Sequence, residues 1–433
     1  MNAALTRLAV AAALAALAPV GFAADQVNGP AHHAAALPLA GDLLYALPPE
    51  PAVRRALAAL PQLRVGAMGE SLALAEQARL VAGPHEWTLS AGTSQRRVTG
   101  ERRYREQEVA AERGLRWFGK AEQDRDIGAQ GVSLAAAQRA DDWHEACRTL
   151  LRDWYDALRA QSALQRLTEQ HALVLQLDHA ARLRVAAGDS PALDAMQAET
   201  EVRRSEALLE QARQEVAQAL ALLAATYEQL PAPAPAALPE PPAPDDGAGA
   251  SDHAVARITD DNHELVLAQA TARLQALQAR RSASERMPDP TLGIRTTRER
   301  DGQERTLGLT LSIPLAGAAR SAEADAAAMR ARMADERVRQ VRNTVLRDAR
   351  HAVAAQGHSY RIWTNLRQVA EQSARQAQLM ARAWQAGEST LGEALLARRQ
   401  ALDAALAAQT AQITALAAAA RVQLDGHALW AFD

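Results

Sequence analysis

The stretch that decides the fold is PDPTLGIRTTRERDGQERTLGLTLSIPL, residues 288–315. Two runs rich in threonine and branched apolar residues flank the turn-forming pair Asp301-Gly302, a pattern that predicts a β-hairpin. In the second run, apolar residues alternate with small or polar ones, so one face of the strand is apolar. The residues of this face are Leu307, Leu309, Leu311, Ile313 and Leu315.

A weaker hairpin is expected at residues 85–117, where WTLSAGT (87–93) resembles PTLGIRT (290–296). Strands of this length with one apolar face are typical of transmembrane β-barrels, although half-buried soluble sheets show the same alternation. Since the rest of the chain offers no element to cover the strands, we expect their apolar face to contact lipid. Four strands cannot close a barrel, whereas three copies of the chain would supply 12.

The remaining sequence is predicted to be helical. Two stretches of 69 residues, 118–186 and 317–385, carry helical periodicity and would each be roughly 100 Å long. The lengths of the shorter helices suggest that they stack end to end in pairs beside the long ones. The expected pairs are 191–229 with 252–286, and 51–81 with 390–424.

Two short segments resemble each other, AGDSPALDAM (187–196) and AGESTLGEAL (386–395). Each begins with a predicted tip, 187–190 or 386–389, that joins a long helix to a shorter one. The glycines Gly188 and Gly387 suit the left-handed position that ends a helix. Ser190 and Ser389 suit the N-cap of the next helix, and Pro191 suits its first position.

The chain is therefore interpreted as one unit written twice. The first repeat spans 51–229 and the second spans 252–425. The linker 230–251 contains seven prolines and cannot be helical, and a short tail, 426–433, follows the second repeat.

The first residues predict export. Residues 1–23 have the features of a signal peptide: Arg7, the apolar run LAVAAALAALA (8–18), and small residues before a cleavage point after Ala23. An N-terminal extension, 24–50, follows. No cysteine lies near the cleavage point, so a lipid anchor is not expected, and Cys147 alone cannot form an internal disulfide. No later apolar run is long enough for a transmembrane helix.

These features resemble the outer membrane factor, or TolC-type, channels. The resemblance rests on the hairpin and the residues after it (288–327), on ERGLRWFGKAEQDRDIGAQG (112–131), and on the two tips. It covers about 45–425 and is closer in the second half. It implies a mainly α protein with a transmembrane β-barrel. A homotrimer would close a 12-strand barrel in outer membrane lipid above a long periplasmic α-helical barrel.

The resemblance also implies a function. The chain would be the exit duct of a tripartite pump, working with a periplasmic adaptor protein and an inner membrane transporter of the resistance-nodulation-division class. The hairpin sequence is most similar to the branch that exports heavy-metal cations. Drug efflux and type I secretion remain alternatives, and a periplasmic adaptor or a structural coiled coil would be a different class. The expected location is the outer membrane with a periplasmic extension.

Two sets of site residues follow from the resemblance. The tips are expected to contact the adaptor, and a gate is expected just inside them, where charged side chains of the second long helix meet across the channel axis. The tip residues are Gly188, Asp189, Ser190, Gly387, Glu388 and Ser389. The gate candidates are Glu371, Arg375 and Arg382.

Other function classes find no support in the sequence. A net charge of −3 gives no reason to expect nucleic acid as a partner. No phosphate-binding loop or catalytic motif occurs, so neither an enzyme nor a cofactor is expected. The pairs His144 with Cys147 and His351 with His358 each share a helical face. Two ligands do not make a metal site, so none is predicted.

Overall fold

The computed structural model describes residues 46–234 and 238–432. The predicted signal peptide and most of the predicted N-terminal extension lie outside these residues. The described helices are α1 (Glu50–Ala59), α2 (Pro61–Ala82), α3 (Lys120–Ala187), α4 (Ala192–Thr226), α5 (Ala250–Asp260), α6 (His263–Ser284), α7 (Ala318–Ala386) and α8 (Leu391–Asp425). Within this part of the chain, no helix combines the length and apolarity needed to cross a membrane.

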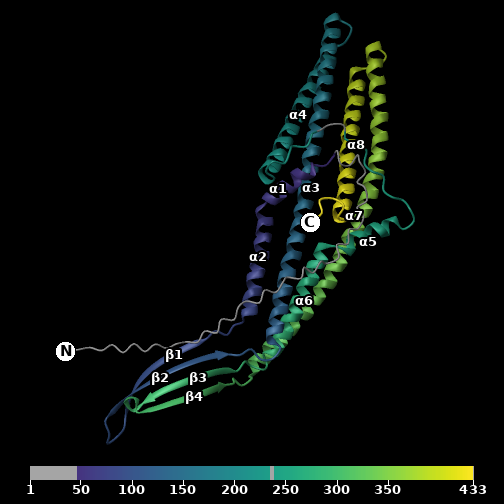
Figure 1. Cartoon of the computed structure of the whole chain (residues 1–433). Helices are drawn as coiled ribbons and strands as arrows, with labels where there is room; N and C mark the ends of the chain where they lie inside the picture. Colours follow the sequence, from purple (N-terminus) through teal and green to yellow (C-terminus); the bar gives the residue numbers. More distant parts are fainter. Residues whose placement is uncertain (1–45, 235–237, 433) are drawn as a thin grey trace, which may run out of the picture. The chain divides into compact units, whose positions relative to one another are not determined.

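The predicted fold class, long helical hairpins plus four strands, is confirmed. The strands are β1 (Thr88–Arg97), β2 (Arg103–Gly114), β3 (Thr291–Glu299) and β4 (Glu304–Ser312). They form one antiparallel sheet in the order β1-β2-β3-β4, and the turn between β3 and β4 has left-handed backbone at Asp301 (φ 61°) and Gly302 (φ 93°). Figure 1 shows the sheet where α2, α3, α6 and α7 meet it, away from the turns that join α3 to α4 and α7 to α8.

The short helices pack along the long ones, but not in the predicted pairs. α2 and α4 occupy successive stretches of α3, as the contacts Arg139–Glu70 (Nη1 to Oε2, 2.8 Å) and His171–Ser205 (Nδ1 to Oγ, 2.8 Å) show. α6 and α8 likewise pack along successive stretches of α7. The stacked pairs are thus α2 with α4 and α6 with α8. Elements that follow one another in the chain tend to be adjacent in space. The predicted pairs were based on helix lengths alone and did not take this tendency into account.

Two segments predicted as single helices are each broken once. The first breaks at Leu60, whose extended backbone (ψ 128°) precedes Pro61, because a residue before proline disfavours the helical conformation. The second breaks after Asp260. There the Asn262 side chain accepts a hydrogen bond from the Leu265 N–H (3.0 Å) and caps the start of α6.

The main hydrophobic core lies midway along the long helices, where α1, α3, α4 and α8 meet. Trp154 Nε1 donates to the Ala46 carbonyl (2.9 Å), and Trp143 Nε1 donates to the Trp430 carbonyl (3.0 Å). The proline-rich linker reaches the same level, where Gln412 Nε2 donates to the carbonyl of Pro239 (2.9 Å). Residues 46–49, before α1, and residues 426–432, after α8, therefore contribute to this core.

Candidate functional sites: two tips, a two-faced sheet and their junction

The two tips have the same backbone structure. Gly188 and Gly387 both have φ of 80° and end their long helices in the left-handed conformation. In each tip, the N–H of the acidic residue after the glycine donates to a carbonyl in the last helical turn, at 2.9 Å. This is the hydrogen bond of a Schellman motif, and it explains why glycine occupies both positions. The internal similarity of the sequence thus corresponds to a repeated local structure.

The surface of both tips is open. Gly188, Asp189, Gly387 and Glu388 are exposed, and a Cβ added to either glycine would meet no atom within 4 Å. The two serines that follow the acids are half-buried. The sequence-based assignment of the tips to a partner contact is not tested by a single chain, but the glycines are accessible to one.

The predicted N-caps are wrong by one residue. α4 is preceded by Pro191, which cannot cap through its side chain, and Ser190 lies one position further back. α8 is capped by Thr390 rather than Ser389. Thr390 Oγ1 accepts from the Glu393 N–H (3.3 Å), and Glu393 Oε2 accepts from the Thr390 N–H (2.9 Å). Glutamate three residues after threonine forms a capping box, a pattern that Ser389 lacks.

Thr390→Ala is expected to lower the free energy of unfolding by about 1 kcal/mol, because α8 would lose the side-chain acceptor at its first turn. Ser389→Ala is the matched control and is expected to change stability by less than half as much. Denaturant unfolding in detergent, followed by helical circular dichroism, measures both. Equal losses in the two variants would contradict the assignment of Thr390 as the cap.

The two helical hairpins, α3–α4 and α7–α8, contact each other close to their tips. Arg184 Nη1 donates to the Trp384 carbonyl (2.7 Å), and its guanidinium lies over the Trp384 ring, 5.3 Å from the ring centroid. Leu177, Leu391 and other residues of all four hairpin helices bury a small core around this contact. No local sequence pattern indicates the contact between Arg184 and Trp384, because the two residues lie in different repeats.

An apolar groove of about 440 Å³ lies between α4 and α8, close to the tips. Three of its side chains are largely exposed: Leu193 (58%), Met196 (66%) and Leu396 (51%). Exposed apolar side chains grouped beside a tip are typical of a surface that binds another protein.

The gate candidates lie on α7, on the tip side of its midpoint. Glu371 pairs weakly with Arg367 (3.9 Å) and not with Arg375, which is exposed. Arg382 lines a hollow between α3, α7 and α8 that also contains Arg398. One chain does not bring these residues together across an axis, so the gate stays a prediction.

The sheet has one apolar face, as the alternation predicts. Cross-strand partners share a face, and the register places Leu309 opposite Ile294, Ile294 opposite Ala111, and Ala111 opposite Leu89. The large apolar side chains of this face are exposed in the single chain, with Leu307 at 72% and Leu309 at 80%. The strand is shorter than predicted. β4 ends at Ser312, so Ile313 and Leu315 lie beyond it, because Pro314 cannot donate to a sheet.

The other face of the sheet is polar and acidic. Arg96 lies 3.6 Å from Glu106, and Arg295 lies 3.6 Å from Glu108. Acids outnumber these two arginines on this face. The glutamates are Glu106, Glu108, Glu112, Glu299 and Glu304.

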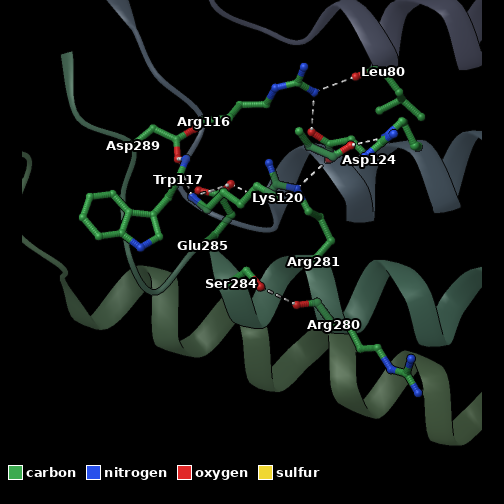
Figure 2. Close-up of polar contacts among 12 residues, drawn as sticks. Leu80, Arg116, Trp117, Lys120, Asp124, Arg280, Arg281, Ser284, Glu285 and Asp289 are labelled. Carbon is green, nitrogen blue, oxygen red and sulfur yellow. Dashed lines mark hydrogen bonds and ion pairs between the residues drawn. The ribbon is translucent and has the colours of Figure 1, made fainter. Parts of the chain in front are cut away.

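A buried polar network joins the sheet to the helices (Figure 2). Lys120, only 1% exposed at the start of α3, places Nζ 2.8 Å from Asp289 Oδ1 and 2.8 Å from the Met287 carbonyl. Asp289 Oδ1 also accepts from the Trp117 N–H (3.0 Å), and Oδ2 lies 2.8 Å from His85 Nε2. One carboxylate thus ties the segments that connect α2 to β1, β2 to α3 and α6 to β3.

Arg116 and Asp124 extend the network to α2 and α6. Arg116 donates to the Leu80 carbonyl (2.9 Å) and to Asp124 Oδ2 (3.1 Å), while Arg281 Nε donates to Asp124 Oδ1 (2.6 Å). Figure 2 shows these side chains converging from different elements. Sequence reasoning noted the surrounding stretch but missed the network, because its members are ordinary charged residues far apart in the chain.

The ionisation of Asp289 reflects its partners. Burial alone would raise the pKa of this carboxyl, but the hydrogen bonds from Lys120, His85 and the Trp117 N–H outweigh burial and lower the pKa to about 2. Asp289 is therefore ionised at any physiological pH and acts as a fixed acceptor for three donors.

The histidine and cysteine pairs considered from the sequence do not form sites as pairs. Cys147 is fully buried in the main core, and burial raises the pKa of its thiol to about 12. His351 and His358 are exposed on α7. His144 has different neighbours from Cys147: its ring lies close to two other histidines, His263 and His427.

An exposed apolar sheet face, two long helical hairpins and a stacked set of shorter helices define a class of fold, that of the TolC-type outer membrane channels. The solved structures of three such channels share it. OprN has a TM-score of 0.73 at 18% identity, covering 88% of this chain and 90% of that one. CusC has a TM-score of 0.73 at 14% identity, with coverage of 87% and 91%. The CmeC channel of Campylobacter jejuni has a TM-score of 0.72 at 14% identity, with coverage of 87% and 85%.

No protein-family model matches the sequence, and neither does any curated protein. At identities of this size, the likeness concerns the fold. The chain shares its fold with these channels over 87–88% of its own length and 85–91% of theirs.

Proposed function

We propose that this chain is the outer membrane exit duct of a tripartite efflux system, a passive channel rather than an enzyme. One observation carries the proposal: the same chain has an exposed apolar sheet face and exposed helical tips, and its fold matches that of outer membrane channels. A periplasmic adaptor, the alternative class, is less well supported, because the fold match to channels covers 87–88% of the chain.

Closure of the sheet supports a homotrimer. β1 and β4 each pair with one strand in the described chain, and unpaired strand edges are costly in lipid. Pairing β4 of one copy with β1 of the next removes both edges. Three copies of the four-stranded sheet give a 12-strand barrel, wide enough for a polar lumen.

The tips and the adjacent groove are the proposed adaptor contact. Both tips are exposed and lie side by side through the Arg184–Trp384 contact, so a helical hairpin of the adaptor can engage both repeats at once. The inner membrane partner is proposed to be a transporter of the resistance-nodulation-division class.

Heavy-metal cations are the proposed cargo, with drug efflux and type I secretion as alternatives for the same duct. The acidic polar face of the sheet supports cations. If the apolar face contacts lipid, this face lines the lumen, where five glutamates and two arginines per chain leave a negative potential.

The acidic face leads to an expected ion preference. The purified protein in a planar bilayer should pass cations more readily than anions, and Glu106→Gln/Glu108→Gln/Glu112→Gln should weaken that preference. The reversal potential under a salt gradient measures it. Arg97→Gln, which removes a charge from the opposite, apolar face of the sheet, should leave the cation preference unchanged. An anion-selective wild type would rule out the acidic lumen.

Fractionation tests the function as a whole. The chain should be recovered from outer membranes as a trimer that survives mild detergent at room temperature, because the strand edges are paired between copies. Cross-linking and size analysis of the detergent extract measure the assembly. Recovery as a monomer from the soluble periplasmic extract would refute the exit-duct proposal.

A further inference from the structure

Three histidines from distant parts of the chain meet near the middle of the molecule. His144 lies in α3, His263 opens α6, and His427 follows the end of α8. One ring nitrogen from each lies within 4.8 Å of the others, and the ring centroids are 4.6–5.6 Å apart. His144 is buried and the other two are half-buried, so the cluster is both enclosed and reachable.

Two of the rings are held in position by oxygen atoms. His144 Nε2 lies 3.2 Å from Asp425 Oδ1, and His427 Nε2 lies 3.1 Å from the Asp261 carbonyl. An Nε2–H that donates to such an oxygen leaves Nδ1 with a free lone pair. Metal-ligating histidines are commonly oriented in this way by a carboxylate or a backbone carbonyl.

Carboxylates lie beside the cluster. Asp425 contacts His144, and the buried Oδ1 of the nearby Asp141 has no hydrogen-bond partner within the described residues. Such carboxylates offset part of the charge of a cation held by neutral imidazoles, the form that binds metal.

We propose that His144, His263 and His427 form a binding site for a borderline divalent cation, with Zn²⁺ as the test ion. Three imidazoles suit zinc and its first-row neighbours, and the fourth position stays open to water. Zinc–nitrogen bonds of about 2.0–2.1 Å require nitrogens about 3.3 Å apart, so the rings close by at most about 1.5 Å. The proposal goes beyond the exit-duct function and does not depend on it.

A bound ion would connect α3 to the start of α6 and to the segment after α8. The start of α6 and the end of α8 meet here, at the junction between the part of the chain that carries the sheet and the part that carries the tips. This junction is called the seam. The ion would therefore hold this seam closed, and cation binding would stiffen the middle of the protomer.

Metal titration of the purified full chain tests the proposal. After chelator treatment, the wild type should bind one Zn²⁺ per chain by calorimetry, with three nitrogen ligands in X-ray absorption spectra. His263→Ala/His427→Ala should weaken binding at least about 100-fold, since two of three ligands are gone. Zn²⁺ should raise the midpoint of thermal unfolding of the wild type and leave that of the double variant unchanged.

His351→Ala/His358→Ala is the matched control, because it removes two exposed histidines of α7 and should keep wild-type affinity. Metal-free unfolding of all three proteins shows whether the variants are folded. Equal affinity in the wild type and His263→Ala/His427→Ala, or no stoichiometric binding by the folded wild type, would overturn the site.

A second, independent feature is a group of arginines on the apolar-side face of the sheet, toward the turns. In the described residues none of the five forms an ion pair, whereas Arg96 and Arg295 on the opposite face are both paired. All five are exposed. They are Arg97, Arg103, Arg105, Arg298 and Arg305.

Four of these arginines form two directly opposed cross-strand pairs. Arg97 is directly opposite Arg103 in the register, and Arg298 is directly opposite Arg305. Like charges in directly opposed positions destabilise a sheet. Arg103, Arg105 and Arg298 also line a hollow of about 460 Å³ with Gln95, Gln107 and Asp301. The Asp301 carboxylate already accepts from the Arg105 N–H (2.8 Å) and pairs with Arg102 (3.3 Å), so among the described residues it leaves the three guanidinium groups without an acidic partner. An anion seated among these guanidinium groups would remove the repulsion.

The geometry points to the phosphate groups of a phosphorylated glycolipid in the outer leaflet as the occupant. This inference rests on the exit-duct proposal, in which the apolar band beside the arginines lies in the membrane. The arginines then lie at the boundary where lipid headgroups begin, and they face lipid rather than the lumen.

Nanodiscs test this lipid contact. In phosphatidylcholine nanodiscs containing diphosphorylated lipid A, Arg97→Gln/Arg298→Gln/Arg305→Gln should retain lipid A about tenfold more weakly than the wild type, as measured by native mass spectrometry. Arg96→Gln/Arg295→Gln, on the other face, should match the wild type. Equal retention of dephosphorylated lipid A, or equal losses in both variants, would overturn the proposal. Failure of the wild type to enter nanodiscs would refute the exit duct and this contact together.

Discussion

Asp289→Ala is expected to lower the free energy of unfolding by about 3–5 kcal/mol, the range found when one partner of a buried ion pair is removed. The carboxylate accepts from Lys120, the Trp117 N–H and His85, so its loss removes an acceptor from three donors, of which Lys120 keeps the Met287 carbonyl and Glu285 as partners. Lys120 is 1% exposed and cannot turn to water without opening the junction. Denaturant unfolding in detergent, followed by circular dichroism, measures the loss.

Asp325→Ala is the matched control. Asp325 pairs with Arg286 at 2.8 Å near the same junction, but its side chain is 71% exposed, so its removal should cost less than about 1 kcal/mol. Asp289→Asn keeps an oxygen acceptor and should fall between the two. If Asp289→Ala and Asp325→Ala lose the same amount, the junction network is not a principal source of stability.

The effect of Asp289 should also depend on pH. Its pKa is about 2 in the folded chain and 3.8 in the reference state, so the ionised carboxyl stabilises the fold fully above the reference value. The difference between wild type and Asp289→Ala should stay constant from neutral pH to about pH 5 and shrink as the pH falls toward 2. A difference that grows on acidification would contradict the assigned hydrogen bonds.

Local patterns predicted the elements well. Alternation in 304–312 predicted the apolar face of β4, and Asp301-Gly302 predicted its turn, because strand and turn preferences act over a few residues. The left-handed glycines at 188 and 387 were predictable for the same reason. Errors fell at boundaries, where Pro61 and Asn262 each act on a single residue within a longer helical pattern.

Sites built from distant residues were not predictable. The Lys120–Asp289 ion pair and the His144, His263 and His427 cluster join segments more than 100 residues apart, and no local pattern marks their members. The sequence pairs His144 with Cys147 by helical spacing, but the structure turns Cys147 into the core and His144 toward α6 and the C-terminal segment. Helical spacing defines a face, and packing decides what that face meets.

Gly188→Arg/Gly387→Arg is expected to abolish export in cells that depend on this duct, and Gly387→Arg alone should reduce it strongly. Both glycines have φ of 80°, where a side chain costs about 1 kcal/mol, and no atom lies within 4 Å of an added Cβ. The folded chain should therefore tolerate the arginines. Their bulk would instead occupy the space that the proposed adaptor hairpin enters. Survival of the cells on a toxic heavy-metal cation, the proposed cargo, measures the loss.

Gly188→Asn/Gly387→Asn separates bulk from backbone strain, because asparagine adopts the left-handed conformation readily and is much shorter than arginine. This variant should retain most export. All variants should assemble and reach the outer membrane like the wild type, since the tips lie far along α3 and α7 from the sheet. A double arginine variant that assembles normally and still exports at the wild-type rate would show that the tips do not contact the adaptor. Loss of assembly in that variant would instead show that the glycines serve the fold, because the Schellman turns would then be what the arginines disrupt.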